Sequence, residues 1–198
     1  MSSLKGTRHS SLVLSGVAFA PMPWVVFLRA VNVGKANRCQ PALIAKELSK
    51  FDIVNIGAVG TFVVRADVSE SALRAALARK LPFKCEIMIC PANELLNLAK
   101  ENPFAGHRND DIDAHVSIMR ERLAKIPKLP IYAPSKNKWE IKILDVVGTA
   151  VLSLRRRVKN GRLYPNAIVE KQFGVAATTR SCNTIEKVAT VLRQDSLD

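Results

Sequence analysis

The chain has few acidic residues, few aromatic residues and no long apolar run. Asp and Glu number 17 against 30 Lys and Arg, so the formal net charge is +13, and aromatic residues make up 6% of the sequence. No apolar stretch reaches the about 20 residues that cross a membrane. These scarcities argue against a membrane-spanning protein and against an RNA-binding domain that stacks bases on aromatic side chains. The basic excess instead favours an acidic partner, either nucleic acid or an anionic metabolite.

Cysteine and histidine are also scarce. There are three histidines, and the four cysteines form no CxxC pair: Cys39, Cys85, Cys90 and Cys182. Such sparse cysteines favour reduced thiols in a cytoplasmic protein and predict no metal site. Cys39 follows Arg38 near a predicted helix start, where the pKa of a thiol can be lowered, although a buried structural thiol is the simpler interpretation. The glycine-rich motifs for dinucleotides and nucleoside triphosphates are absent, so we expect no cofactor.

Residues 1–21 superficially resemble a secretory signal. Lys5 and Arg8 precede a short apolar stretch that ends in an A-x-A pattern. Pro21 follows this pattern directly, and Met22 stands immediately before the first predicted strand. We therefore predict that residues 1–21 are a disordered tail or an extension from an upstream start, rather than a signal peptide.

Residues 22–104 alternate strands and helices. In order, the patterns predict a β-rich run at 24–33, a helix from about 41, two β-rich runs around Gly57 and Gly60, a helix capped by Ser69, and a strand after Pro82. The order β-α-β-β-α-β is that of a ferredoxin-like unit. Pro91 then starts a further helix, which Pro103 ends. We assign this part of the chain to an N-terminal α/β-plait subdomain.

Residues 105–198 form a second predicted α+β subdomain. The patterns predict a strand at 113–120, a proline-rich loop at 124–138, a hairpin that turns near Gly148, a helix from Pro165 to Gly174, and a last helix that Asn183 and Glu186 cap. The whole chain is thus predicted to be an α+β protein of two ferredoxin-like subdomains packed side by side.

The loop after the first strand is a candidate ligand site. It combines a glycine turn with polar and basic side chains: Gly34, Lys35, Asn37 and Arg38. The loop has neither the spacing nor the hydroxyl group of a phosphate-binding P-loop. Two interpretations stay open, generic anion binding near a helix start and an ordinary connection whose asparagines satisfy the backbone.

Two further groups of residues are candidates. Thr179, Arg180 and Asn183 precede or begin the last helix, where a phosphate could bind or a cap could simply form. A cationic segment could contact phosphate backbones without reading sequence, and it contains Arg155, Arg156, Arg157, Lys159 and Arg162. The acidic stretch 109–113 fits a solvated loop better than a metal site. No catalytic triad or HxxxH pattern is present, so the sequence assigns no catalytic residue.

Three segments resemble the bacterial family named domain of unknown function 1697. Its members begin with a strand that reads Leu-Arg-Gly-Ile-Asn-Val-Gly-Gly, which corresponds here to residues 28–35 with Ala30 and Lys35 in place of glycines. Its Gln-Ser-Gly-Asn turn falls on residues 58–61, and its Thr-Thr-Arg-Asn-Trp-Asn-Thr segment falls on residues 178–184, with Cys182 in place of the aromatic residue. The resemblance implies two α/β-plait subdomains and no established activity.

Three hypotheses of function follow. The first is that the protein binds an anionic ligand, above all nucleic acid, through the opening loop and the arginine segment. The second is an enzyme that acts on a small phosphorylated or carboxylated metabolite between the subdomains, with Arg29, Asn32, Lys35 and Arg180 holding the ligand. The third is a structural or assembly protein that forms a dimer. The sequence does not decide whether the protein is an enzyme.

Overall fold

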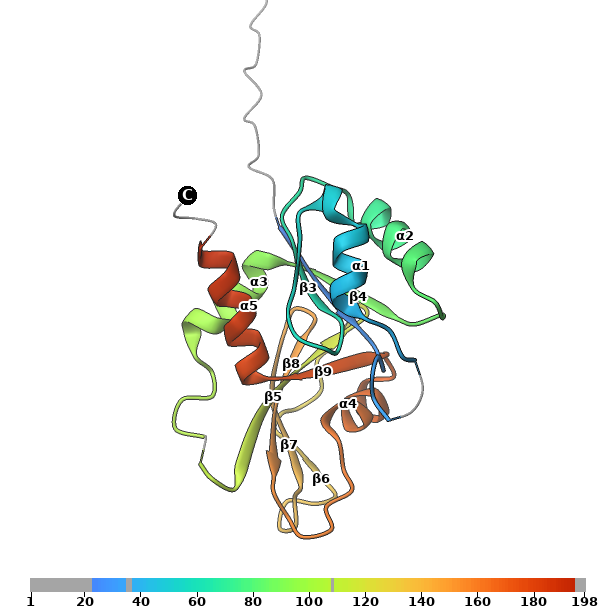
Figure 1. The fold of residues 1–198 in the computed structure, drawn as a ribbon. Helices are drawn as coiled ribbons and strands as arrows, with labels where there is room; N and C mark the ends of the chain where they lie inside the picture. Colours follow the sequence, from blue (N-terminus) through green and yellow to red (C-terminus); the bar gives the residue numbers. More distant parts are fainter. Residues whose placement is uncertain (1–22, 35–36, 108, 195–198) are drawn as a thin grey trace, which may run out of the picture.

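The computed structural model describes residues 23–34, 37–107 and 109–194. The predictions for residues 1–21 and for Lys35 therefore lie outside the described residues. The described chain forms two antiparallel sheets with helices packed against them (Figure 1). The predicted mixed α+β class is confirmed.

The first sheet contains four strands in the order β2-β3-β1-β4. The elements in chain order are β1 (Trp24–Leu28), α1 (Pro41–Glu47), a short 3-10 helix (Ser49–Phe51), β2 (Ile53–Asn55), β3 (Thr61–Val64), α2 (Glu70–Lys80) and β4 (Ile87–Pro91). The Ser69 hydroxyl caps α2 by accepting from the backbone N–H of Ala72 at 3.3 Å, as predicted. The first strand ends at Leu28, earlier than predicted, because Ala30 and Asn32 have positive φ angles that a strand cannot contain.

The second sheet contains five strands in the order β6-β7-β8-β5-β9. After α3 (Ala92–Glu101), the chain forms β5 (Ile112–Met119), β6 (Ile131–Ala133), β7 (Ile141–Val147), β8 (Ala150–Arg156), α4 (Pro165–Phe173), β9 (Ala177–Ser181) and α5 (Cys182–Gln194). The strand β6 corrects the prediction of a loop at 124–138. Its length of three residues, between Pro130 and Pro134 at the edge of the sheet, explains why no strand pattern was visible.

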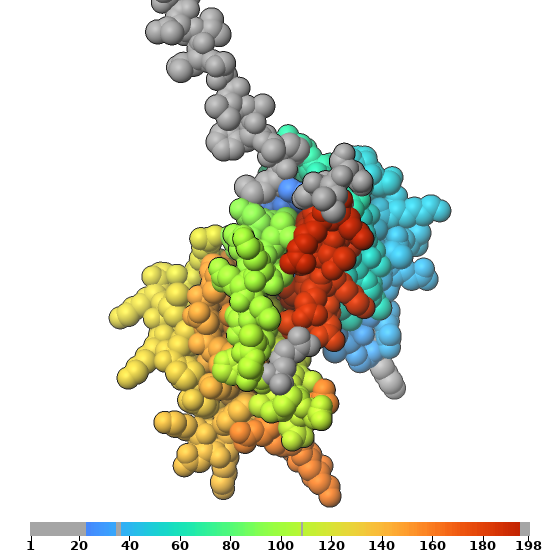
Figure 2. All heavy atoms as spheres, turned by 90° about the vertical axis from the view of Figure 1, so that its left-hand side faces the viewer, coloured from blue at the N-terminus to red at the C-terminus, as the bar shows by residue number. Residues whose placement is uncertain are grey.

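The two sheets share one hydrophobic core. The helices α3 and α5 pack against inner faces of both sheets, through residues such as Val25 and Phe27 in β1, Val116 in β5 and Val188 in α5. Figure 2 shows α3 and α5 side by side on one face of the molecule, in light green and red. The opposite faces are covered separately, the first sheet by α1 and α2 and the second by α4. The junction between the sheets is thus fixed by shared packing.

None of the helices in the described ranges combines the length and the apolar character that a membrane crossing requires.

Candidate functional site

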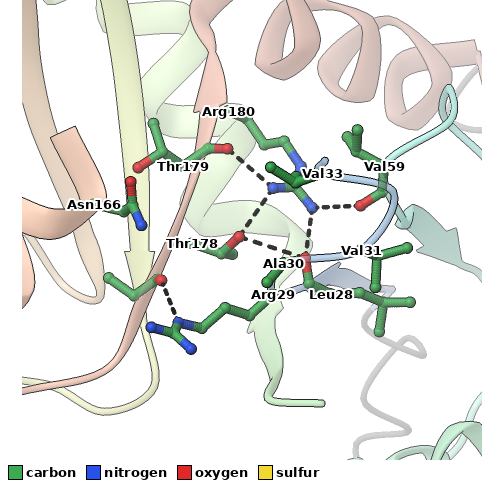
Figure 3. Close-up of a pocket in the computed structure, with 11 residues that line it drawn as sticks. Leu28, Arg29, Ala30, Val31, Val33, Val59, Asn166, Thr178, Thr179 and Arg180 are labelled. Carbon is green, nitrogen blue, oxygen red and sulfur yellow. Dashed lines mark hydrogen bonds between the residues drawn. The ribbon is translucent and has the colours of Figure 1, made fainter. Parts of the chain in front are cut away.

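A cavity of roughly 260 Å³ lies where the end of the first sheet meets β9 and α4. We call it the junction pocket (Figure 3). One side comes from β1, the loop after it and the turn before β3, and the other side comes from β9 and the first turn of α4. The lining residues are Leu28, Arg29, Ala30, Val31, Val33, Val59, Asn166, Ala177, Thr178, Thr179 and Arg180. Segments about 150 residues apart therefore build one site.

Arg180 lies at the centre of this junction, and its side chain is buried, with 7% of the residue exposed. Its Nε donates to Thr61 Oγ1 at 2.8 Å, and Nη1 donates to Thr178 Oγ1 at 3.0 Å and to the Thr179 carbonyl at 2.9 Å. Its Nη2 donates to the carbonyls of Leu28 at 2.9 Å and Val59 at 3.0 Å. The guanidinium thus ties the second sheet to the first.

The positive charge of Arg180 has no acidic counterpart in the part of the chain that the structure describes. All of its hydrogen-bond acceptors among the described residues are carbonyl or hydroxyl oxygens. Burial lowers the pKa of Arg180 to about 10, so the side chain is still protonated at neutral pH. The ring of Phe27, 5.6 Å from the guanidinium carbon, adds a cation–π contact but no charge.

Gly60 allows the turn before β3 to approach this centre. Its φ angle is +71°, and a Cβ atom on it would lie 2.7 Å from Leu28 Cδ1. The Gly60 carbonyl accepts both from the Leu28 N–H at 2.8 Å and from Arg180 Nη2 at 3.3 Å. A larger residue would push the turn away from Arg180.

Arg29 lies at one side of the junction pocket and forms an ion pair with Glu170 of α4. Its Nε and Nη2 donate to the two carboxylate oxygens at 2.9 and 3.0 Å, and Nε also donates to the Ala177 carbonyl at 3.2 Å. Glu170 additionally accepts from the Ala177 N–H at 2.9 Å. These hydrogen bonds to Glu170 raise the pKa of Arg29, and the pair is electrically neutral.

The polar residues of the opening loop bind the backbone of this loop and of the turn before β3. The Asn32 amide donates to the carbonyls of Cys39 and Ala58 at 2.9 and 2.7 Å, and its oxygen accepts from the Cys39 N–H at 3.1 Å. Asn37 donates to the Ala30 carbonyl at 3.3 Å, and Arg38 donates to the Gly34 carbonyl at 2.6 Å. These contacts match the interpretation in which the side chains stabilise a connection.

The structure brings only part of the predicted site residues together. Arg29, Thr179 and Arg180 line the junction pocket, whereas Asn32 and Arg38 line a separate hollow on the other side of the loop. Asn183 lies with Arg157 at a third hollow. The helix α5 begins at Cys182, two residues earlier than a cap at Asn183 predicts, so Asn183 lies within its first turn. The Ser181 hydroxyl is paired with that of Thr184 at 3.1 Å.

The arginine segment lies apart from the junction pocket. Arg157 is paired with Asp113, with 3.0 Å between Nε and Oδ2, and this contact lowers the pKa of the carboxyl group. Arg155 and Arg156 stack on the rings of Tyr164 and Trp139, at 5.0 and 4.1 Å. Two further exposed cations, Lys159 and Arg162, follow on the connection to α4.

Two polar residues of the site were not predicted: Glu170 and Asn166. In the predicted helix, Glu170 falls at a position typical of an exposed residue. No sequence pattern links it to Arg29, 141 residues away. Asn166 follows Pro165 at the predicted helix start, so only its position at a helix end could have drawn attention to it. Thr178, which precedes the last helix together with Thr179 and Arg180, also lines the pocket.

No metal-binding cluster forms among the described residues, and the thiols of Cys39 and Cys85 are not activated. No three His, Cys, Asp or Glu side chains gather closely enough to hold a metal ion within the described ranges. Burial raises the pKa of Cys39, which corrects the alternative that neighbouring charge lowers it. The pKa of Cys85 is raised to about 11, again mainly by burial.

The fold and the site define a mixed α+β protein with two antiparallel sheets, one shared core and a cationic pocket at the sheet junction. The chain belongs to the family described as "Protein of unknown function (DUF1697)", whose model matches residues 22–144. The predicted family membership is thus confirmed. The chain is similar in fold to the structure of the conserved bacterial protein SP0830 from Streptococcus pneumoniae, with 13% identity and a TM-score of 0.56. That likeness covers 86% of this chain and 98% of the other. No curated protein matches the sequence.

Proposed function

We propose that the protein binds a small anionic ligand in the junction pocket. The observation that carries this proposal is the buried charge of Arg180, which lines the pocket and has no acidic partner among the described residues. An uncompensated cation in a medium of low polarity attracts an anion more strongly than an exposed cation does. Exposed lysines and arginines elsewhere on the chain lack this advantage because water screens them.

The proposal is for binding, without an assigned reaction. Of the four residues expected to hold a metabolite, Arg29 and Arg180 line the junction pocket, Asn32 binds the loop backbone, and Lys35 lies outside the described residues. The described side chains that line the pocket include no histidine, cysteine or carboxylate.

A thermal-shift experiment tests the proposal. Small carboxylates and phosphates, added at constant ionic strength, should raise the midpoint of thermal unfolding because a ligand of the folded state stabilises it by mass action. In the variant Val33→Glu, a negative charge at the pocket lining should reduce this shift.

A matched variant separates local from general charge effects. Val147→Glu makes the same substitution at another exposed valine, on the β7–β8 hairpin, and should respond to anions as the wild type does. If no anion raises the midpoint, or if both variants lose the shift equally, the proposal is wrong.

Nucleic acid is the second candidate, and it uses the arginine segment. Arg155 and Arg156 stack on aromatic rings and form no hydrogen-bonded ion pair among the described residues, and Tyr164 is 58% exposed. Arg155→Gln should then weaken binding to a labelled oligonucleotide more than Arg157→Gln, because Asp113 already neutralises Arg157. Binding that does not weaken with salt would contradict this candidate.

The ferredoxin-like architecture and the division at residue 104 remain proposals. The order β2-β3-β1-β4, with helices after β1 and β3, supports a plait in residues 22–104. The order β7-β8-β5-β9 supports a second plait, in which β6 stands where the first helix would be. A cytoplasmic location also remains a proposal, which the free cysteines support.

A further inference from the structure

We infer that the anion held in the junction pocket is a monocarboxylate with a small apolar body. This inference rests on the proposed function and narrows it to one class of ligand. It follows from the charge of the pocket, from its free hydrogen-bond donors and from the apolar side chains opposite them.

Counted with Glu170, the described residues that line the pocket carry a net charge of one unit. Two arginines line it, but Arg29 is neutralised by the two-point contact with Glu170. Only Arg180 is left without a carboxylate among the described residues. A ligand with one negative charge balances this site, whereas a phosphate dianion would leave an excess negative charge next to Glu170.

The donors for the ligand come from Thr179 and Asn166. Ser117 is completely buried, and its hydroxyl lies 2.7 Å from Thr179 Oγ1, the one acceptor for its hydrogen among the described residues. Ser117 must therefore donate, and the hydroxyl hydrogen of Thr179 is left for the pocket. The Asn166 amide makes no hydrogen bond within the described part of the chain and lines the same pocket.

Arg180 supplies charge without further hydrogen bonds. Its five N–H groups already have protein acceptors, so it cannot form the bidentate contact with which arginine recognises phosphate. These two side chain groups, the Thr179 hydroxyl and the Asn166 amide, suit the two oxygens of a carboxylate, whereas inorganic phosphate has four oxygens, more than the three hydrogens that these groups can donate.

The remaining lining is apolar. Ala30, Val33 and Val59 line the pocket from the loops of the first sheet (Figure 3). An alkyl chain attached to the carboxylate would bury apolar area against these residues, at about 0.8 kcal/mol or fourfold in affinity for each buried methylene.

Ligand titration monitored by NMR tests the inference, with acetate, butyrate, hexanoate, butyramide and inorganic phosphate as probes at pH 7.5. Butyrate should bind about fifteenfold more tightly than acetate, as two more methylenes are buried. Butyramide and phosphate should bind at least tenfold more weakly than butyrate. If phosphate binds as tightly as butyrate, the inference is wrong while the proposed function stands. If none of the anions binds, or if butyramide equals butyrate, both are wrong.

Variants of Asn166 and Thr179, the two residues that donate hydrogen bonds to the ligand, provide the second test. Asn166→Asp keeps the shape but cancels the charge of the pocket, so butyrate affinity should fall at least tenfold. Asn97→Asp makes the same substitution at an exposed position of α3 and should leave the affinity unchanged. Thr179→Val should lower the affinity for butyrate, whereas Thr179→Ser should keep the wild-type affinity because it retains the hydroxyl group. Equal affinities in Asn166→Asp and Asn97→Asp would overturn the inference.

Discussion

At the scale of the residue, Ala30 is a position with a strained backbone next to the junction pocket. Its φ angle is +55°, in the left-handed region, and its carbonyl accepts from the Asn37 amide. An alanine in this conformation is strained by about 1 kcal/mol because its Cβ approaches the carbonyl oxygen. Glycine, the residue of the family pattern at this position, relieves the strain.

Ala30→Gly should therefore stabilise the protein by about 0.5–1 kcal/mol, even though glycine adds freedom to the unfolded chain. Urea unfolding measures the change. Ala75→Gly, at an exposed position in α2, should instead destabilise by about 1 kcal/mol, since a helix interior disfavours glycine. The same sign at both positions would contradict the argument from φ.

His115 is a second residue whose surroundings predict a measurable effect. Burial lowers its pKa, while the charge of Asp113 opposes this shift, and its Nδ1 atom is buried without a partner among the described residues. The unfolded chain therefore binds a proton near pH 6.5 before the folded chain does. The neutral imidazole therefore makes its full contribution to the free energy of unfolding above pH 6.5. This contribution falls as the pH decreases toward the lowered pKa of His115 in the folded state.

In His115→Gln, the loss of unfolding free energy between pH 7.5 and pH 5.5 should be smaller than in the wild type. Denaturant titrations at the two pH values measure it. His107→Gln, at an exposed position, serves as the control and should keep the wild-type pH dependence. A His115→Gln variant with unchanged pH dependence would show that this imidazole titrates alike in both states.

At the scale of the element, local sequence patterns predict helices, strands and turns well, but they do not predict which distant residues come into contact. Three features depend only on residues that are close in sequence, so they could be predicted: the cap at Ser69, the β7–β8 hairpin and the apolar alternation of β5. By contrast, the acceptors around Arg180 come from residues up to 152 positions away. No local periodicity encodes which strand ends meet, and so the junction pocket could not be predicted.

The ion pair between Arg29 and Glu170 connects the end of β1 to α4, and thus the two halves of the chain. A double-mutant cycle with Arg29→Gln and Glu170→Gln should give a coupling of about 1 kcal/mol, because the contact is two-pronged and only partly exposed. The more exposed pair of Lys80 and Glu47, with one contact at 3.0 Å, should couple by less than about 0.5 kcal/mol. A larger coupling in that second cycle would refute this ranking.

At the scale of the whole molecule, the shared core decides how the chain unfolds. α3 and α5 pack against both sheets, and Arg180 adds hydrogen bonds across their junction. Neither half could separate from the other without exposing this apolar surface to water, which couples their stabilities. The chain should therefore unfold in one cooperative transition, although it contains two sheets.

Two tryptophans make this testable, since Trp24 lies in β1 of the first sheet and Trp139 precedes β7 of the second. In Trp139→Phe the fluorescence reports the first half, and in Trp24→Phe it reports the second half. For each variant, the fluorescence midpoint in urea should coincide with the midpoint of its own far-ultraviolet circular dichroism, which follows all helices and strands together. If the two signals separate in either variant, the halves unfold independently, and the boundary proposed at residue 104 divides two autonomous units rather than two layers of one core.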